Sequence, residues 1–270
     1  MPEATLRRTA LVTGASAGIG QAFARVFAER GWSLVVTARR KDRLDSLAEE
    51  LETRHGTRVH VVAQDLSHRD ASVHILREVE RAGMTIDALV NNAGFGVAGA
   101  FRHTTWRQQA DFLQVMVTAV CELSHRVLPG MVDRRFGRIV NVSSMLGLLP
   151  GIGGLTLYSA AKAFLVRFSQ SLALETRSHG VYVTAVCPGF TYSEFHDVSG
   201  TRAAVSRLPS LMWTEADVVA RQGYDASMAG EVVCVPGSVN KGLAALARLL
   251  PEGLVQYAMS GANPRPSRQG

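Results

Sequence analysis

The chain has 270 residues, a formal net charge of +6 and 47% hydrophobic side chains. This length and apolar content suit one large α/β domain with a well-filled core and exclude a disordered protein. No uninterrupted apolar stretch reaches the ~20 residues that a membrane span needs, and residues 1–14 lack the apolar run of a signal peptide, so we expect neither.

Short β-branched runs alternate with longer amphipathic segments along the chain. The predicted strands are 9–13, 34–37, 59–63, 88–91, 138–143, 181–187 and 232–235. The predicted helices are 19–30, 41–54, 71–82, 106–134 and 157–179. Glycines stand where these helices are expected to stop, as C-terminal capping predicts: Gly31, Gly56, Gly83, Gly137 and Gly180.

Single helices between the strands imply right-handed crossovers and therefore a parallel sheet. The predicted fold class is α/β, with a doubly wound, Rossmann-like sheet of seven parallel strands and helices on both faces. We expect one domain over residues 1–270, in which residues 194–224 form a lid over the substrate and residues 264–270 a disordered tail.

Residues of unusual chemistry follow the predicted strands, at the carboxyl ends where doubly wound sheets bind their ligands. They are Gly14, Arg39, Asp65, Asn91, Ser144 and Pro188. Because the fold gathers these ends on one edge of the sheet, the sequence predicts a single binding site there.

The segment Thr13–Gly20, TGASAGIG, follows the first strand and opens the first helix. Gly14 permits a tight turn, Gly18 lets the backbone approach a pyrophosphate, and Gly20 allows close contact between helix and sheet. The amide N–H groups of the helix N-terminus then face the phosphates. The nucleotide-binding residues predicted in this loop are Gly14, Ser16, Gly18, Ile19 and Gly20.

Tyr158 and Lys162 are four residues apart in a predicted helix, which places both side chains on one face. A phenol has a pKa of about 10, and lowering this to about 7 needs roughly 4 kcal/mol. An ammonium at about 4 Å in a half-buried site supplies energy of that order. The pair therefore predicts acid–base chemistry, although the same spacing also occurs on ordinary helix surfaces.

Several of these motifs occur together between Thr9 and Phe195: the GxxxGxG glycine spacing, Asn91-Asn-Ala-Gly94, Ser143-Ser144, Tyr158-x-x-x-Lys162 and Pro188-Gly189. The combination resembles the short-chain dehydrogenase/reductase family, in its single-domain, ketoreductase-like branch. The resemblance implies hydride transfer between a nicotinamide cofactor and a carbonyl or secondary alcohol.

Residue roles follow from this resemblance. It implies that Tyr158 protonates the substrate oxygen, that Ser144 hydrogen-bonds that oxygen with Ser143 as a structural neighbour, and that Lys162 also bonds the nicotinamide ribose. Asn91 either contacts the cofactor or ties neighbouring strands together. The other implied cofactor contacts are Asp65, Leu66, Ala93, Gly94, Pro188, Gly189, Thr191 and Ser193, with Ser193 preferred over Thr191 as the partner of the carboxamide.

The second strand ends near Ala38 and is followed by Arg39, Arg40 and Lys41. A cofactor without a 2′-phosphate usually meets Asp or Glu at this place, and Ala38 offers no such acceptor. Arg39 presents a guanidinium suited to a phosphate. Cations at a helix N-terminus also oppose its dipole, which favours an anionic ligand over merely solvated charges. Arg39 and Arg40 therefore predict NADP(H) rather than NAD(H).

Met116 departs from the family pattern. Similar enzymes usually carry Asn at this place, where it anchors a water that relays protons to the lysine. A thioether is only a weak acceptor and cannot position that water equally well. Either solvent or Thr118 substitutes and activity is retained, or catalysis is impaired.

The sequence thus predicts an NADP(H)-dependent short-chain oxidoreductase. The alternative is a catalytically impaired NADPH-binding sensor or scaffold protein of the same fold; a sugar-nucleotide epimerase fits poorly because little chain remains for a substrate domain. Apolar residues within 195–213 favour an apolar, fairly bulky substrate. The helices 106–134 and 157–179 resemble the surfaces through which relatives form homodimers and homotetramers.

Other partners are not expected. The basic residues are dispersed and match no nucleic-acid motif, and the histidines lack metal-ligand spacing, so we expect neither nucleic acid nor metal. The cysteines, at 121, 187 and 234, have no CxxC spacing and suit a reducing compartment, which favours a cytoplasmic protein.

Overall fold

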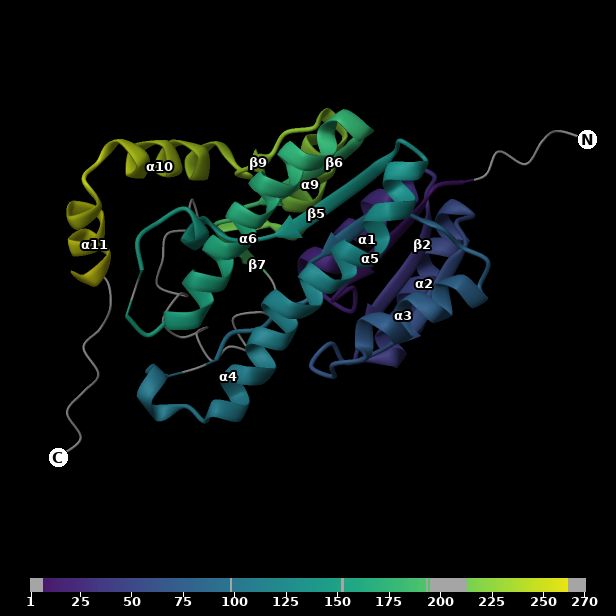
Figure 1. Cartoon of the computed structure of the whole chain (residues 1–270), viewed down its shortest axis with the longest axis horizontal. Helices are drawn as coiled ribbons and strands as arrows, with labels where there is room; N and C mark the ends of the chain where they lie inside the picture. The colour runs from purple at the N-terminus through teal and green to yellow at the C-terminus, as the bar shows by residue number, and fades with distance from the viewer. Residues whose placement is uncertain (1–6, 98, 152, 193, 195–212, 262–270) are drawn as a thin grey trace, which may run out of the picture.

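Seven parallel strands form the central sheet (Figure 1) in a computed structural model that describes residues 7–97, 99–151, 153–192, 194 and 213–261. Their spatial order is β3-β2-β1-β4-β5-β6-β9, and every pairing is parallel. The strands are β1 Thr9–Thr13, β2 Ser33–Ala38, β3 Val59–Ala63, β4 Ile86–Asn91, β5 Gly137–Val142, β6 Val181–Val186 and β9 Val233–Cys234. The predicted doubly wound sheet of seven strands is confirmed.

Helices cover both faces of this sheet (Figure 1). The α-helices are α1 Gly18–Glu29, α2 Lys41–His55, α3 Ala71–Arg81, α4 Trp106–Leu113, α5 Ala119–Asp133, α6 Thr156–Thr176, α9 Ala216–Ala229, α10 Ser238–Leu249 and α11 Glu252–Gly261. Short helical turns are η1 Phe101–His103, η2 Gln114–Thr118, η3 Met145–Gly147 and η4 Arg177–His179. Helices α1, α2 and α9 pack together on one face, and α3, α5 and α6 lie on the other.

The hydrophobic core is divided into two layers by the sheet. Val12 and Val36 face α1, α2 and α9, whereas their neighbours Leu11 and Val35 face α3 and α5. All five residues of β1 are buried, as expected for a parallel strand covered on both sides. The near-continuous apolar runs that predicted the strands therefore reflect burial on both faces.

The predicted helix 106–134 is divided into three segments. Helix α4 passes into the π-helical turn η2 at Gln114 and continues as α5 from Ala119. Among the described residues, this stretch alone is long and apolar enough by composition to cross a membrane. Its buried side chains pack against the sheet and α3, which is the arrangement of a core helix.

The end of α5 differs from the prediction. Gly31, Gly56, Gly83 and Gly180 have positive φ angles at helix ends, as expected. At α5, however, Arg135 takes the left-handed conformation, with φ 51°, and Gly137 begins β5. Gly137 is needed for space instead, because a Cβ there would lie 2.6 Å from the Met131 sulfur.

The predicted lid, residues 194–224, needs a correction at its C-terminal end. Residues 195–212 lie outside the described part of the chain. Trp213–Glu215 form β8, which pairs in parallel with β7, Phe190–Tyr192. The following helix, α9, packs closely on α1, and its Tyr224 ring meets Phe27 edge-on at 5.0 Å. Helix α9, which begins at Ala216, therefore packs on the domain core instead of forming part of a lid. The predicted tail, 264–270, is likewise outside the described residues.

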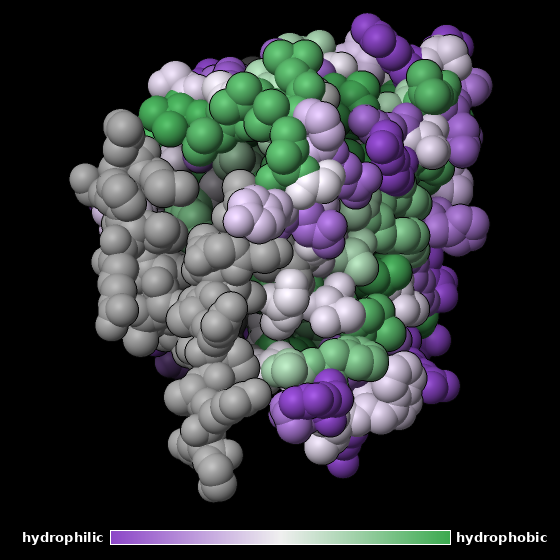
Figure 2. Space-filling model, turned by 90° about the vertical axis from the view of Figure 1, so that its left-hand side faces the viewer, coloured by the Kyte–Doolittle hydropathy of each residue, from purple (hydrophilic) through white to green (hydrophobic). Residues whose placement is uncertain are grey.

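Helices α10 and α11 were not predicted, and they lie beside the main body of the domain (Figure 1). They expose large apolar side chains: Leu243, Leu246, Leu249, Leu250, Leu254 and Tyr257. Figure 2 views the molecule from this end and shows apolar side chains gathered along its upper part. The amphipathic period is present in the sequence, but these helices contribute few residues to the core.

A buried amide–hydroxyl network joins β4, β5, α5 and α6. Asn91 donates to Asn141 Oδ1 at 2.8 Å and to Ser124 Oγ at 3.2 Å. Asn141 in turn donates to Ser169 Oγ at 2.9 Å. These side chains are almost fully inaccessible, so each bond replaces a lost contact with water. The structure thus shows Asn91 tying neighbouring strands together.

We expect Asn141→Ala to destabilise the protein by about 2–3 kcal/mol, because it removes the shorter of the two hydrogen bonds of the buried Asn91 amide and leaves the Ser169 hydroxyl without its donor. Urea unfolding followed by circular dichroism measures this loss. Gln170→Ala, which removes an exposed hydrogen bond from Arg167, is the control and should stay within about 0.5 kcal/mol of wild type. Equal stability of the two variants would contradict the role given to the network.

Candidate active site

The predicted site residues gather at the carboxyl ends of the strands, around the point where the strand order reverses. Strands β1 and β4 are neighbours in the sheet, whereas β2 lies on one side of them and β5 on the other. Such a reversal opens a crevice between the loops that follow the two central strands. The loops at Gly14 and at Asn92 border this crevice.

The glycine loop lies against the loop after β4. Gly14 has φ 66°, and a Cβ there would lie 2.8 Å from Ala93 Cα. Thr13 holds the two loops together, because its hydroxyl accepts from the backbone N–H groups of Asn92 at 2.9 Å and Ala93 at 3.0 Å. The Asn92 amide donates to Thr13 O at 3.0 Å. A residue larger than glycine at 14 would separate these loops.

The N-terminus of α1 is built to receive an anion. Its N-cap residue, Ala17, provides no side-chain cap, and its first turn carries no acidic residue. Gly18 adopts φ 55°, and a Cβ at Gly20 would strike the Gly14 carbonyl. The first amide groups of the helix thus remain open to a phosphate at the positive end of the dipole. This cradle fits the pyrophosphate of a dinucleotide.

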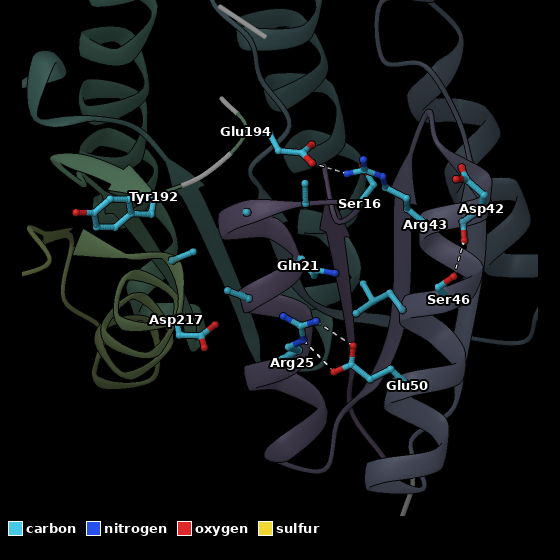
Figure 3. A pocket seen from close by; sticks show the side chains of 15 residues that line it. Ser16, Gln21, Arg25, Asp42, Arg43, Ser46, Glu50, Tyr192, Glu194 and Asp217 are labelled. Carbon is cyan, nitrogen blue, oxygen red and sulfur yellow. Dashed lines mark hydrogen bonds and ion pairs between the residues drawn. The ribbon is translucent and has the colours of Figure 1, made fainter. Parts of the chain in front are cut away.

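Basic side chains surround a carboxylate at the end of β2. Arg40 donates to Ser16 Oγ at 3.1 Å and to Glu194 at 2.9 Å. Arg43, in the first turn of α2, donates to the other oxygen of Glu194 at 2.6 Å (Figure 3). Arg39 is exposed. Arg40 thus lies at the glycine loop, as predicted, while the sequence analysis missed Arg43 and Glu194.

A cavity of about 610 Å³ lies between α1, α2 and α9, next to this cluster (Figure 3). The ion pair between Arg25 and Glu50, at 2.9 Å, lines it. Tyr158 is not among its lining residues. The cavity therefore borders the site at the end of β2 and is separate from the Tyr158–Lys162 pair.

The predicted residues after β3 and β4 are also placed near the crevice. Asp65 accepts from the Ser67 backbone N–H at 2.9 Å, and Leu66 is buried. Gly94 packs against the Met116 side chain, so that a Cβ at Gly94 would lie 2.6 Å from the Met116 sulfur. The Asn91 side chain donates to Asn141 and Ser124 in the buried network.

Tyr158, Ser144 and Lys162 come together where β5 meets α6. The Tyr158 hydroxyl is hydrogen-bonded to the Ser144 side chain. Lys162 Nζ lies 5.5 Å from the centroid of the Tyr158 ring and donates to the Val142 carbonyl at 2.8 Å. Ser143 instead donates to the Lys162 carbonyl at 2.7 Å. Of the two serines, Ser144 is thus the one that faces the phenol.

Burial dominates the protonation of this pair. Although part of the Tyr158 side chain is accessible, its hydroxyl is surrounded by protein atoms. Burial raises the pKa of Tyr158 to about 12, and the Ser144 hydrogen bond lowers it only in part. Burial likewise lowers the pKa of Lys162 to about 8. In this structure the Lys162 ammonium is directed at the Val142 carbonyl and burial dominates at the phenol, so a lowering of the Tyr158 pKa toward 7 by Lys162 stays a prediction.

Met116 fills the position where the resemblance expects Asn. It is fully buried against Phe112 and Ala161, inside the π-helical turn. Thr118 is exposed. Because Lys162 is buried and Thr118 is exposed, Thr118 is not placed to replace the missing amide, which leaves substitution by solvent and impaired catalysis as the two alternatives.

The segment after β6 borders the same crevice. The Pro188 carbonyl accepts from the Met145 backbone N–H at 2.9 Å, which ties the segment to the turn that carries Ser144. A Cβ at Gly189 would lie 2.6 Å from Asn240 Oδ1. The Thr191 hydroxyl is directed at the Gly189 carbonyl at 3.2 Å. Ser193 lies outside the described residues.

Comparison with known proteins places this architecture in a family. A sequence model of the family described as short chain dehydrogenase matches residues 8–203. Nodulation protein G of a Rhizobium species is 37% identical over 244 residues, which cover 88% of this chain and 97% of that protein. The chain belongs to the short-chain dehydrogenase/reductase family of oxidoreductases, as the motif set indicated.

Two solved structures share the fold over nearly their whole length. A short-chain dehydrogenase from Sphingobium yanoikuyae, solved in complex with NADPH, has a TM-score of 0.79 and 32% identity, covering 97% of this chain and 98% of that one. The bulky-bulky ketone specific alcohol dehydrogenase from Comamonas testosteroni has a TM-score of 0.76 and 29% identity, covering 98% of both chains.

The functional residues that sequence reasoning missed share one property: their importance depends on contacts between distant segments. Arg43 and Glu194 are 151 residues apart. Thr13 and Asn92 lie within the motifs quoted from the sequence, but their contact joins the end of β1 to the loop after β4. A signal for Arg43 was present in the sequence, because it follows Arg39 and Arg40 within the first turn of α2. No local pattern marks Glu194.

The buried Lys162 predicts a pH-dependent difference in stability. Burial lowers its pKa to about 8 in the folded protein, from 10.5 in the unfolded chain. Between these values the unfolded chain binds the extra proton, so stability rises with pH. We expect the free energy of unfolding of wild type, relative to Lys162→Met, to increase by about 2–4 kcal/mol from pH 7 to pH 10.5. Urea titrations at both pH values measure it, and a difference that is flat with pH would contradict the assignment.

Proposed function

We propose that the protein is an NADP(H)-dependent reductase of ketones, or in the reverse direction a dehydrogenase of secondary alcohols. The observation that carries this proposal is the contact of the Tyr158 phenol with Ser144, beside a buried Lys162 at the edge of the nucleotide crevice. A proton donor and a second hydrogen-bond donor then face one substrate oxygen.

The roles of the residues follow from their protonation. NADPH held at the glycine loop would supply the hydride that the carbonyl carbon accepts. Tyr158, whose raised pKa keeps it protonated at neutral pH, donates its proton to the carbonyl oxygen. Ser144 turns its hydroxyl to the same oxygen and stabilises the negative charge that develops there. Lys162 provides a cation beside the phenolate that forms and returns a proton toward it.

The glycine loop would hold the pyrophosphate, and the end of β2 selects the cofactor. Ala38 offers no carboxylate to the ribose hydroxyls, whereas Arg40 and Ser16 lie together at the loop and Arg39 is exposed beside them. This donor set suits a 2′-phosphate. The NADPH bound by the Sphingobium relative supports the same preference. We therefore assign NADP(H) as the cofactor.

An apolar, bulky ketone is the proposed substrate class. Phe190 and Tyr192 of β7 contact Trp213 of β8, with ring centroids 5.8 and 4.8 Å apart, and form an aromatic wall next to the segment after β6. The specificity named for the Comamonas relative, a bulky-bulky ketone, points the same way. Aromatic walls of this kind favour apolar ligands of comparable size.

The assembly that we propose is a homodimer or homotetramer formed through α4–α5 and α6. These helices expose Trp106, Phe164 and Leu174, the last at 86%. Phe164 stacks on Phe168 at 5.8 Å, which gives α6 a flat apolar surface. We also propose a cytoplasmic location, which the three free cysteines favour.

The rival function, a sensor or scaffold that binds NADPH without turnover, has one supporting observation, the Met116 side chain in place of an amide. The Tyr158, Ser144 and Lys162 side chains are all present and in contact or close to it. An intact acid–base group favours the enzyme.

The central test is consumption of NADPH across a panel of bulky ketones and aldehydes, with Tyr158→Phe beside the wild type. We expect the substitution to lower kcat by about 10²–10⁴-fold, because the proton donor is lost, while NADPH affinity stays within about twofold. Tyr182→Phe, at the opposite end of the sheet, is the matched control and should retain full activity. Equal turnover by Tyr158→Phe would refute the mechanism.

Met116→Asn tests the departure from the family pattern. The amide would provide a donor and an acceptor inside the π-helical turn, so we expect kcat to rise by about tenfold if proton supply to Lys162 limits turnover. Met116→Leu, which preserves volume and adds no polar atom, should leave kcat unchanged. Stopped-flow and steady-state rates measure both variants. A kcat for Met116→Asn no higher than that of Met116→Leu would show that the missing amide is not limiting.

A further inference from the structure

Glu194 occupies an unusual place for an acidic side chain. It lies two residues after the end of β7, yet its carboxylate is bound by arginines at the end of β2 and the start of α2 (Figure 3). One carboxylate oxygen accepts from Arg40 at 2.9 Å and the other from Arg43 at 2.6 Å. The carboxylate thus bridges two guanidinium groups in the way that an oxyanion ligand would.

The surroundings explain why a negative charge is stabilised there. Arg40 is the N-cap residue of α2 and Arg43 lies in its first turn, where cations are unfavourable beside the positive end of the helix dipole. An anion between the two guanidinium groups offsets their mutual repulsion and their repulsion by the positive end of the helix dipole. The hydrogen bonds from Arg43 and Arg40 also hold the pKa of Glu194 below its usual value, so the carboxylate is charged at neutral pH.

The same two arginines are needed by a second anion. Arg40 also donates to Ser16 of the glycine loop, so the donors that hold Glu194 are continuous with the phosphate cradle. A phosphate on the 2′-position of the adenosine ribose would carry nearly two charges into this place. It cannot share both arginines with Glu194 without repulsion between like charges.

We propose that Glu194 is an internal substitute for the 2′-phosphate, which the cofactor must displace from Arg40 and Arg43 in order to bind. This proposal rests on the proposed preference for NADP(H) and adds a residue that sets its strength. A nucleotide that lacks the 2′-phosphate brings no charge to exchange for the carboxylate, so it leaves the Glu194 contact in place.

The experiment compares two ligands that differ only in the 2′-phosphate: adenosine 2′,5′-bisphosphate and adenosine 5′-monophosphate. Calorimetric titration gives both dissociation constants for wild type, Glu194→Gln and Glu50→Gln. Glu50→Gln is the matched control, because it removes one negative charge from an ion pair with Arg25 that lines the same cavity. These ligands report binding without any turnover.

We expect Glu194→Gln to bind the bisphosphate about three- to tenfold more tightly than wild type, the range for removing competition at partly exposed ion pairs. Its affinity for the monophosphate should be unchanged, and Glu50→Gln should match wild type for both ligands. NADP⁺ and NAD⁺ should repeat the pattern.

Three other outcomes are possible, and each contradicts either the displacement of Glu194 or the preference for NADP(H). If wild type prefers the bisphosphate and Glu194→Gln does not strengthen that preference, the displacement is refuted and the assignment of NADP(H) stands. If wild type has no preference for the bisphosphate, the cofactor assignment fails and the displacement with it. If Glu50→Gln tightens binding as much as Glu194→Gln, the effect is one of overall charge and the specific role of Glu194 is refuted.

Discussion

The attachment of helix α6 to the end of β5 is the interaction on which the candidate site depends. Ser143 at the end of the strand donates to the Lys162 carbonyl, and Lys162 donates back to the Val142 carbonyl, at 2.7 and 2.8 Å. Gly147 allows this contact, since a Cβ there would strike the Lys162 carbonyl. These reciprocal bonds fix the rotation of α6, and Tyr158, one turn earlier, is thereby held against Ser144. The buried network from Asn91 through Asn141 to Ser169 fixes the same helix further along its length.

This attachment places a cation in a site with little solvent, and the arrangement is unfavourable for stability. A lysine whose pKa is lowered to about 8 by burial is destabilising in its charged form at neutral pH. Its bond to Val142 offsets only part of that loss. If position 162 served only to pack α6 against β5, an apolar residue there would make the protein more stable. Retention of charge there is therefore better explained by chemistry than by packing, as is common where pKa values are strongly perturbed.

The sequence predicted most of the fold because its signals are local. Buried β-branched runs marked the seven strands, and Gly31, Gly56, Gly83 and Gly180 marked helix ends through their backbone conformation. Gly137 was misread because a glycine required for space against Met131 cannot be told from a capping glycine in sequence alone. The site residues at strand ends were placed by the same topology. The upward shift of the Tyr158 pKa was not predictable, since the burial that causes it depends on atoms from several elements. The contact of Glu194 with Arg40 and Arg43 was not predictable either, because Glu194 is more than 150 positions from either arginine and meets them only in the folded chain.

The π-helical turn at Met116 combines a distorted backbone with an apolar side chain, at the position where the resemblance expects Asn. Such turns hold an extra residue within a helix and occur frequently at functional sites. Here the turn spans Gln114–Thr118, and the side chain at its centre packs on Gly94 and against Phe112 and Ala161. The helix is therefore distorted at this point, but the side chain there is a thioether and not the amide that the resemblance expects. Packing now occupies the space between the loop after β4 and α6, and the Lys162 ammonium makes its bond to the Val142 carbonyl.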